Sequence, residues 1–341
     1  MLARRGSSAR RVTFMNTCDP STVRRTRTAV MSAAALAVSA GLVAWLLARL
    51  DAARTLELLR RADTAWLALA AAVVLTNPFL MVVRWRGVLR AQAGQSVAGN
   101  AAGAARGGLP FSVALRAVLI ANVLNSVLPS KAGDLAKALY LKRHGGLTRG
   151  LGSVLLERSV DFLVLGALSM AGYGISRVAW GLWTGAALVA GVAGVFALML
   201  AVPLERLGLP IPGRARAAAV EFGALWRGWI VHPAAIAQTV GGSLGVWLSN
   251  GLIVFALIRA FGPPLPLSFA FSVYPTAILA GLVPATVSGV GTRDAAFVFL
   301  LGARMSVEEA TLVALGYTVI GYWLLSLISL PVVWWELRRN R

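Results

Sequence analysis

The chain has 341 residues, of which 58% are hydrophobic and only 13% are charged. This composition lies far outside that of soluble domains and is typical of a protein that crosses a membrane several times. The formal net charge of +20 would suit a nucleic-acid partner. However, the arginines gather at the ends of apolar runs with no recognition module between them, a pattern that indicates membrane topology and no nucleic-acid binding.

The N-terminal segment, residues 1–27, contains seven arginines and the single cysteine, Cys18. We interpret it as a basic cytoplasmic tail that is disordered. The uncharged run 28–48 follows, and its length exceeds the roughly 7–15 apolar residues of a signal-peptide core, so it predicts a retained first span. Cys18 has no partner for a disulfide and no metal-ligand spacing around it, and we predict no metal and no cofactor.

Further runs are long enough to cross a bilayer, which takes about 20 apolar residues. They are residues 64–83, 178–204, 233–258 and 310–335. Residues 150–176 are equally long but carry three charges, Glu157, Arg158 and Asp161. We predict that this segment also spans. The sequence "RWRGVLR" at 84–90 is interpreted as an interfacial anchor, and Trp334 and Trp335 as aromatic-belt residues.

Two further segments are interrupted and are predicted to form re-entrant hairpins. Residues 117–130 form an apolar stretch that ends at Pro129, Gly133 and a lysine-rich segment. If this stretch crossed, five basic residues would lie outside, so it is expected to dip in and return. Residues 260–292 are uncharged and broken by five prolines, including Pro284, before a glycine-rich turn. This second hairpin is expected to enter from the opposite side.

Positive-inside counting places 24 of the 33 basic residues, and both termini, in the cytoplasm. The predicted fold is all-α: a polytopic helical membrane protein with about six spans and two re-entrant hairpins, in the cytoplasmic (inner) membrane. Because the hairpins open from opposite sides, they suggest inverted repeats, with which many transporters build a central site. Residues 28–337 form one transmembrane domain and 338–341 a cytoplasmic tail. A bundle of eight spans is the alternative.

Three motifs carry a resemblance to a known family: "NSVLPSKAGDLAKAL", "GLTRGLGSVLLERSVD" and "VPATVSGVGTRDAAF". Over residues 84–335 the chain resembles the transmembrane domain of lysylphosphatidylglycerol synthases, also called the flippase-like family. Asp134 stands where that family has Glu, and Lys137 where it has Arg. Thr318 stands where its last span usually carries an arginine, a departure that bears on headgroup chemistry.

The resemblance implies lipid as the substrate and a set of charged and hairpin residues as the site. Charges at the centre of a spanning helix cost roughly 2.5–3.5 kcal/mol each, so they are expected to pair or to face a polar cavity. Arg158, Arg293, Lys131 and Lys137 are predicted to bind substrate, and Asp134, Glu157, Asp161 and Asp294 to pair with them or carry coupled protons. The predicted hairpin breaks are Pro129, Gly133, Pro284, Gly289 and Gly291.

Simpler interpretations of these residues stay open. Arg158 and Asp161 are three residues apart on a helix, so the charges in 150–176 could be an ion pair that stabilises the bundle. Lys131 and Lys137 could be positive-inside anchors, and the segment around Arg293 a plain interfacial loop. If a short helix starts near Thr292 instead, its free N–H groups favour a phosphate, and Arg293 adds donors.

The leading functional hypothesis is a transporter or flippase for an anionic lipid, either a phospholipid or a polyprenyl-phosphate carrier. In this hypothesis Arg158 and Arg293 bind the headgroup phosphate from opposite sides of one cavity, and the hairpins alternate as gates. Synthases of the family carry a large aminoacyltransferase domain, whereas about six residues follow Trp335 here, so we expect no enzyme activity. The alternative is a non-catalytic partner of a separately encoded lipid-modifying enzyme or glycosyltransferase.

Overall fold

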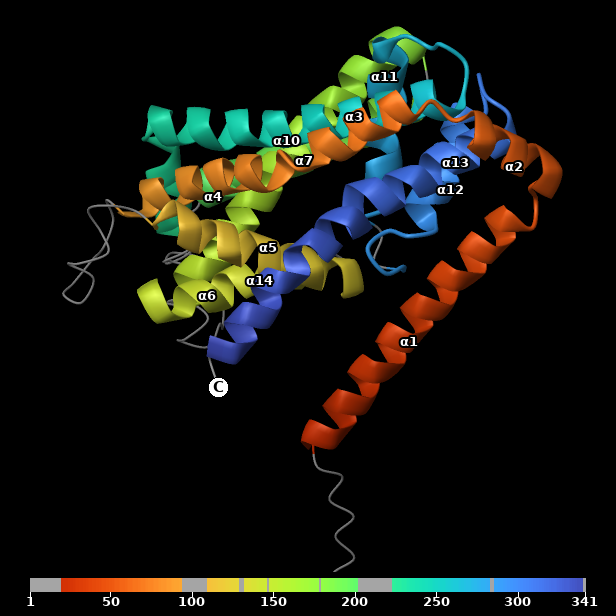
Figure 1. The fold of residues 1–341 in the computed structure, drawn as a ribbon. Coiled ribbons are helices and arrows are strands. Elements are labelled where there is room, and N and C mark those ends of the chain that lie inside the picture. Colours follow the sequence, from red (N-terminus) through yellow and green to blue (C-terminus); the bar gives the residue numbers. More distant parts are fainter. Residues whose placement is uncertain are drawn as a thin grey trace, which may run out of the picture.

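A computed structural model describes residues 20–93, 109–128, 132–145, 147–177, 179–201, 223–282 and 285–339. In these ranges the chain consists of helices joined by turns, without a β-strand (Figure 1). The prediction of an all-α protein is confirmed. Pro129, Lys131 and Pro284, which the sequence singled out, lie outside the described residues, as do residues 1–19 of the predicted tail.

The helices follow one another along the chain, with a short 3₁₀ turn (η1) and a six-residue π-helical segment (η2) between α-helices. Their bounds are α1 Pro20–Leu47, α2 Ala52–Arg61, α3 Thr64–Val74, α4 Asn77–Ala93, α5 Phe111–Val127, η1 Ala132–Asp134, α6 Leu135–Gly145, α7 Leu147–Ser176, α8 Ala179–Ala201, α10 Pro233–Phe261, α11 Leu267–Ala280, α12 Thr292–Leu301, α13 Val307–Thr318, η2 Val319–Leu324 and α14 Leu325–Arg339. Residues 20–27, predicted as part of the disordered tail, belong to α1.

Four helical stretches among the described residues are long and apolar enough to cross a membrane: Thr64–Ala91, Ala179–Ala197, Pro233–Phe261 and Val307–Arg339. The α1–α2 pair, bent by 89°, would supply a fifth. All of them overlap uncharged runs found in the sequence. Large apolar side chains such as Trp183 and Phe299 are exposed on the outside, as expected of a surface that faces lipid. The chain is therefore a multi-pass membrane protein; the number of spans and the sides from which the hairpins enter stay predictions.

Local sequence signals set several helix starts. Asp51 and Asp63 cap α2 and α3 by accepting hydrogen bonds from backbone N–H groups at 2.9 Å. Ser306 and Glu309 form a capping box at the start of α13. Helix α10 begins at Pro233, whose missing N–H costs nothing in the first turn.

At each of the two predicted breaks, the flanking helices pack against each other. Helices α5 and α6, with η1 between them, are in contact, and so are α11 and α12. Gly133, in η1, lies against α5 so closely that a Cβ atom there would meet the Asn125 nitrogen and lie 2.7 Å from the Ala121 carbonyl oxygen. Gly289 and Gly291 have φ of 75° and 98°, which glycine adopts without strain.

Helix α7 occupies the centre of the bundle and positions the site. It packs against α4, α6, α8, α10 and α11. Helix α14 packs along α5, and α10 along α3 and α4. Helix α1 contacts α12, and its N-terminal part extends away from the bundle (Figure 1). This arrangement brings segments of α4, η1, α6, α7 and α10 that are distant in sequence to one place inside the protein.

Candidate functional site

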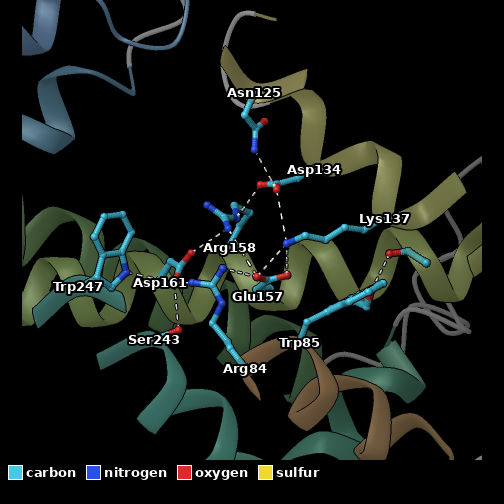
Figure 2. A network of polar contacts seen from close by, with 12 residues as sticks. Arg84, Trp85, Asn125, Asp134, Lys137, Glu157, Arg158, Asp161, Ser243 and Trp247 are labelled. Atoms are coloured by element: carbon cyan, nitrogen blue, oxygen red, sulfur yellow. Dashed lines mark hydrogen bonds and ion pairs between the residues drawn. The ribbon is translucent and has the colours of Figure 1, made fainter. Parts of the chain in front are cut away.

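Six charged side chains from four elements meet in the middle of the bundle (Figure 2). They form the charged cluster: Arg84 of α4, Asp134 of η1, Lys137 of α6, and Glu157, Arg158 and Asp161 of α7. Five of them are buried, and the Arg158 side chain is 21% exposed. Three cations thus face three carboxylates, and the cluster is formally neutral. Such pairing is what allows charges to persist inside a membrane protein.

Glu157 is fully buried and is held by two cations. Its carboxylate accepts a short hydrogen bond from Arg84. The Lys137 ammonium donates to both Glu157 oxygens at 3.1 Å. Lys137 also lies 3.5 Å from Asp134 and 5.8 Å from the centre of the Trp85 ring. Glu157 therefore links three helices, α4, α6 and α7.

Asp161 joins α7 to α10. Its carboxylate accepts hydrogen bonds from Ser243 Oγ at 2.9 Å and from Trp247 Nε1 at 3.1 Å, both on α10. Arg84 Nη1 donates to the same carboxylate at 2.5 Å, and Arg158 Nη2 lies 3.1 Å from its second oxygen. Several donors on a buried carboxylate stabilise its ionised form in place of water.

Arg158 has the most accessible side chain of the cluster. Its Nε lies 3.3 Å from Asp134 Oδ2 but makes no hydrogen bond there, and its Nη2 lies 3.7 Å from Glu157. Asp134 is in turn held by Asn125, which donates to it at 3.2 Å. The contact between Arg158 and Asp134 is thus an ion pair whose geometry leaves the guanidinium able to take another acceptor.

The interpretation of Arg84 as an interfacial anchor is wrong. Its side chain is only 1% exposed, because α4 continues beyond the predicted span and turns this residue toward α7. A signal existed in the sequence: Asn77, Met81 and Arg84 recur at helical spacing, on one face of a helix. All three line the same cavity.

The charged cluster forms one side of an open cavity, where the space free of protein atoms, including space open to the outside, is about 680 Å³. We call it the central cavity. Predicted site residues in its wall are Asp134, Lys137, Arg158 and Asp161, while Glu157 lies behind them. Met81, Val246, Gly321 and Leu325 form an apolar part of the wall. Its other polar and aromatic members, besides Arg84, were not predicted: Asn77, Asn122, Asn125, Ser126, Trp247, Asn250, Tyr317, Tyr322 and Ser326. The sequence signal that could have identified the asparagines is their position as isolated amides within apolar runs.

Arg293 and Asp294 do not line the central cavity. Arg293 instead lines a smaller pocket with Ser288, Gly289 and Tyr322. The Tyr322 ring lies 4.2 Å from the Arg293 guanidinium and also forms part of the central-cavity wall. The single cavity that the sequence predicted between Arg158 and Arg293 is therefore two spaces, with Tyr322 common to both.

Thr318, where the resemblance leads us to expect an arginine, has a hydroxyl that bridges Arg293 and Asp294. Arg293 Nη2 donates to Thr318 Oγ1 at 2.5 Å, and the hydroxyl donates to Asp294 Oδ1 at 2.8 Å. The second Asp294 oxygen accepts from the Gly291 N–H at 2.8 Å, at the start of α12. Asp294 therefore has two roles: it caps the start of α12, and it balances the charge of Arg293.

Replacing Thr318 by valine is expected to lower the free energy of unfolding by about 1–3 kcal/mol, because two buried charged groups each lose a hydrogen bond. The control is Thr311→Val in the same helix, where the buried hydroxyl donates only to the Val307 carbonyl, at 2.7 Å. Denaturant unfolding in detergent measures both. Equal losses for the two variants would contradict a special role for Thr318.

Known proteins resemble this chain in sequence over most of its length. The sequence model of the family described as "Lysylphosphatidylglycerol synthase TM region" matches residues 32–329. Glycosyltransferase AglD of Haloferax volcanii is similar, with 25% identity over 358 aligned positions that cover 91% of this chain. They cover 54% of AglD, so the chain spans about half the length of that relative. Since the family match extends over most of the chain and confirms the resemblance carried by the three motifs, the chain belongs to the lysylphosphatidylglycerol synthase transmembrane-region family.

Proposed function

We propose that the protein is a flippase that moves an anionic lipid, a phospholipid or a polyprenyl-phosphate carrier, across the cytoplasmic membrane, with both termini in the cytoplasm. The observation that supports this most is the placement of Arg158. A partly exposed guanidinium stands in the wall of a polar cavity, inside a protein whose outer surface is apolar. Ionisable groups at such depth mark substrate or ion pathways.

An anionic headgroup suits this site because a guanidinium binds phosphate with two parallel hydrogen bonds. Arg158 Nε has no hydrogen-bond partner in the described part of the chain, and Asp134 lies 3.3 Å from it. A phosphate oxygen would compete with Asp134 for this donor. The displaced carboxylate would still be held by Asn125 and Lys137.

Charge balance suggests how movement could be coupled to an ion. The charged cluster is formally neutral, so an arriving phosphate leaves one negative charge in excess. A proton taken up by Asp134 or by Asp161 would offset it, since both carboxylates face the cavity. The α5–α6 and α11–α12 hairpins are the proposed gates, because each contributes residues next to one of the two pockets.

Reconstitution in liposomes with labelled phosphatidylglycerol or polyprenyl phosphate tests the proposal. Arg158→Ala is expected to lower the initial rate of lipid movement at least about tenfold, since each lost charge-assisted hydrogen bond is worth about 1.5–3 kcal/mol. The control is Arg304→Ala, an exposed arginine outside the cavity. Unchanged rates in Arg158→Ala, or no protein-dependent movement of either lipid, would refute the proposal.

A second function, a non-catalytic partner of a separately encoded lipid-modifying enzyme or glycosyltransferase, is supported by one observation. The relative named as a glycosyltransferase is nearly twice as long as its match to this chain. A partner role predicts that an enzyme depending on this protein keeps its activity when Arg158→Ala replaces the wild type. A transport role predicts that the same exchange abolishes delivery of substrate to that enzyme.

A further inference from the structure

We infer that the central cavity selects lipids whose headgroup carries a hydroxyl beside the phosphate, and that Asn122 and Asn125 of α5 recognise this hydroxyl. The inference rests on the proposed lipid site and names the class of headgroup that it takes. The two asparagines are three residues apart, which places them on one helix face, and both line the cavity.

Each asparagine presents a buried amide atom without a hydrogen-bond partner among the described residues: Nδ2 of Asn122, a donor, and Oδ1 of Asn125, an acceptor. The orientation of Asn125 follows from its other atom, because Nδ2 donates to the Asp134 carboxylate at 3.2 Å (Figure 2). A carboxylate requires a donor there, so the oxygen is the free atom.

The other two amides of the cavity are already engaged within the protein. Asn250 donates to the Val246 carbonyl oxygen at 2.7 Å and accepts from the Tyr317 hydroxyl at 2.8 Å. Asn77 accepts a hydrogen bond from Ser249. Asn122 and Asn125 therefore differ from Asn77 and Asn250, because each has a buried amide atom without a hydrogen-bond partner among the described residues. Such atoms are uncommon in folded proteins.

The chemistry of the missing partner follows from what the two free atoms need. A hydroxyl has one donor and two acceptor positions, so a single hydroxyl can satisfy both Asn122 Nδ2 and Asn125 Oδ1. An ionised phosphate oxygen only accepts, and leaves the Asn125 oxygen without a donor. An ammonium only donates, and leaves the Asn122 amide without an acceptor.

The position of this pair relative to the phosphate site supports the same class. Asn125 donates a hydrogen bond to Asp134, and Asp134 lies 3.3 Å from Arg158. Only Asp134 therefore stands between Asn125 and the arginine that we propose binds the phosphate. Ser126 and Ser326 lie beside them in the wall. A glycerol or a sugar joined to a phosphate carries a hydroxyl and a phosphate in one headgroup, as this pair of neighbouring sites requires.

Binding to the purified protein tests the inference, and three lipids with identical acyl chains serve as probes. Phosphatidylglycerol has the hydroxyls, phosphatidylmethanol has the same phosphodiester charge without them, and phosphatidylethanolamine has an ammonium. The wild type is expected to bind phosphatidylglycerol about tenfold more tightly than either of the other two, as one unsatisfied buried group costs on that order. Lipid-dependent thermal stabilisation gives the affinities.

Asn122→Leu is expected to abolish this preference. Leucine has a similar size and removes an unsatisfied donor, so the unliganded protein is expected to unfold at the wild-type temperature or above it. Leu124→Ala is the control, because Leu124 lies on the same helix but is exposed outside the cavity. Asn125→Leu is the second variant, and it is expected to lose the preference as well.

A second pair of probes separates the two sources of the hydroxyl. Polyprenyl phosphate that carries one hexose is compared with polyprenyl phosphate alone. For each pair, the ratio of the affinities with and without the hydroxyls is measured in the wild type and in Asn122→Leu. A larger ratio for the phosphatidylglycerol pair identifies a glycerol headgroup, and a larger ratio for the polyprenyl pair identifies a sugar, provided that the ratio is lost in Asn122→Leu. Equal binding within both pairs, or a ratio that persists in Asn122→Leu, overturns the inference.

The outcomes also separate this inference from the proposed transport. Binding does not require movement across the bilayer. A protein that moves anionic lipids with no preference for hydroxyls retains the proposed function and refutes the role of the asparagines. A protein that prefers hydroxyl-bearing headgroups and moves none of them keeps that role and refutes transport.

Discussion

Replacing Glu157 by glutamine is expected to lower the free energy of unfolding by about 3–5 kcal/mol, the range for removing one partner of a buried ion pair. Glutamine preserves the shape of the side chain and removes its charge. Arg84 and Lys137, which are 1% and 2% exposed, then each lose one negatively charged partner inside the protein. The measurement is denaturant unfolding in detergent at constant detergent concentration.

The matched control is Glu57→Gln. Glu57 forms an ion pair with Arg61 at 2.7 Å, but both side chains are more than half exposed. Exposed pairs contribute at most about 1 kcal/mol, so this variant should unfold nearly as the wild type does. If Glu157→Gln is as mild as the control, the cations of the charged cluster must reach water, and the buried network would not be what holds the helices together.

A double variant extends this test to the pairing itself. In Glu157→Gln combined with Lys137→Gln, the carboxylate and one of the two cations that donate hydrogen bonds to it are removed together. The double variant is expected to lose less stability than the two single losses added, because the ammonium is no longer left without its main partner. Strict additivity would show that Lys137 and Glu157, although 3.1 Å apart, do not stabilise each other.

Replacing Gly133 by alanine is expected to destabilise the protein by about 1–3 kcal/mol and to reduce lipid movement strongly. The new Cβ would lie 2.7 Å from the Ala121 carbonyl oxygen and would meet the Asn125 backbone nitrogen. These are backbone atoms of α5, so no side-chain end can move aside. Helix α5 and η1 must separate, which carries Asp134 away from Asn125 and from Arg158.

Thermal unfolding and the liposome assay measure these two effects. The control is Gly194→Ala in α8, where no atom lies within 4 Å of the new Cβ. That exchange is expected to stabilise the helix by about 0.5–1 kcal/mol, because alanine loses less backbone freedom on folding. A Gly133→Ala protein that melts and transports as the wild type does would show that the close approach at this hairpin has no importance.

Much of the fold follows from local properties of the sequence. A run of about 20 apolar residues must be helical in a bilayer, because its backbone polar groups find no water there. This is why the predicted runs 64–83, 178–204, 233–258 and 310–335 overlap long helices of the structure. Proline- and glycine-containing breaks act locally as well, so Gly133, Gly289 and Gly291 lie where one helix ends and the next begins.

Part of the site could also be predicted from local properties of the sequence. Glu157, Arg158 and Asp161 stand out because charges are costly within an apolar segment, and all three belong to the buried network. Helical spacing also offered the pair of Arg158 and Asp161, whose side chains lie 3.1 Å apart in the structure. Composition and pattern, however, did not indicate which groups of other helices the three residues contact.

Only the tertiary structure determined those partners. Arg84 contacts Glu157 across 73 positions of sequence, and its burial depends on α4 packing against α7, which no local pattern encodes. Arg293 lies behind Tyr322 because η2 places that ring between two pockets. The sequence by itself determined an α-helical membrane protein with two broken segments and a set of buried charges. Which charges pair, and which polar groups share the central cavity, depended on helix packing, because these contacts join residues far apart in the chain.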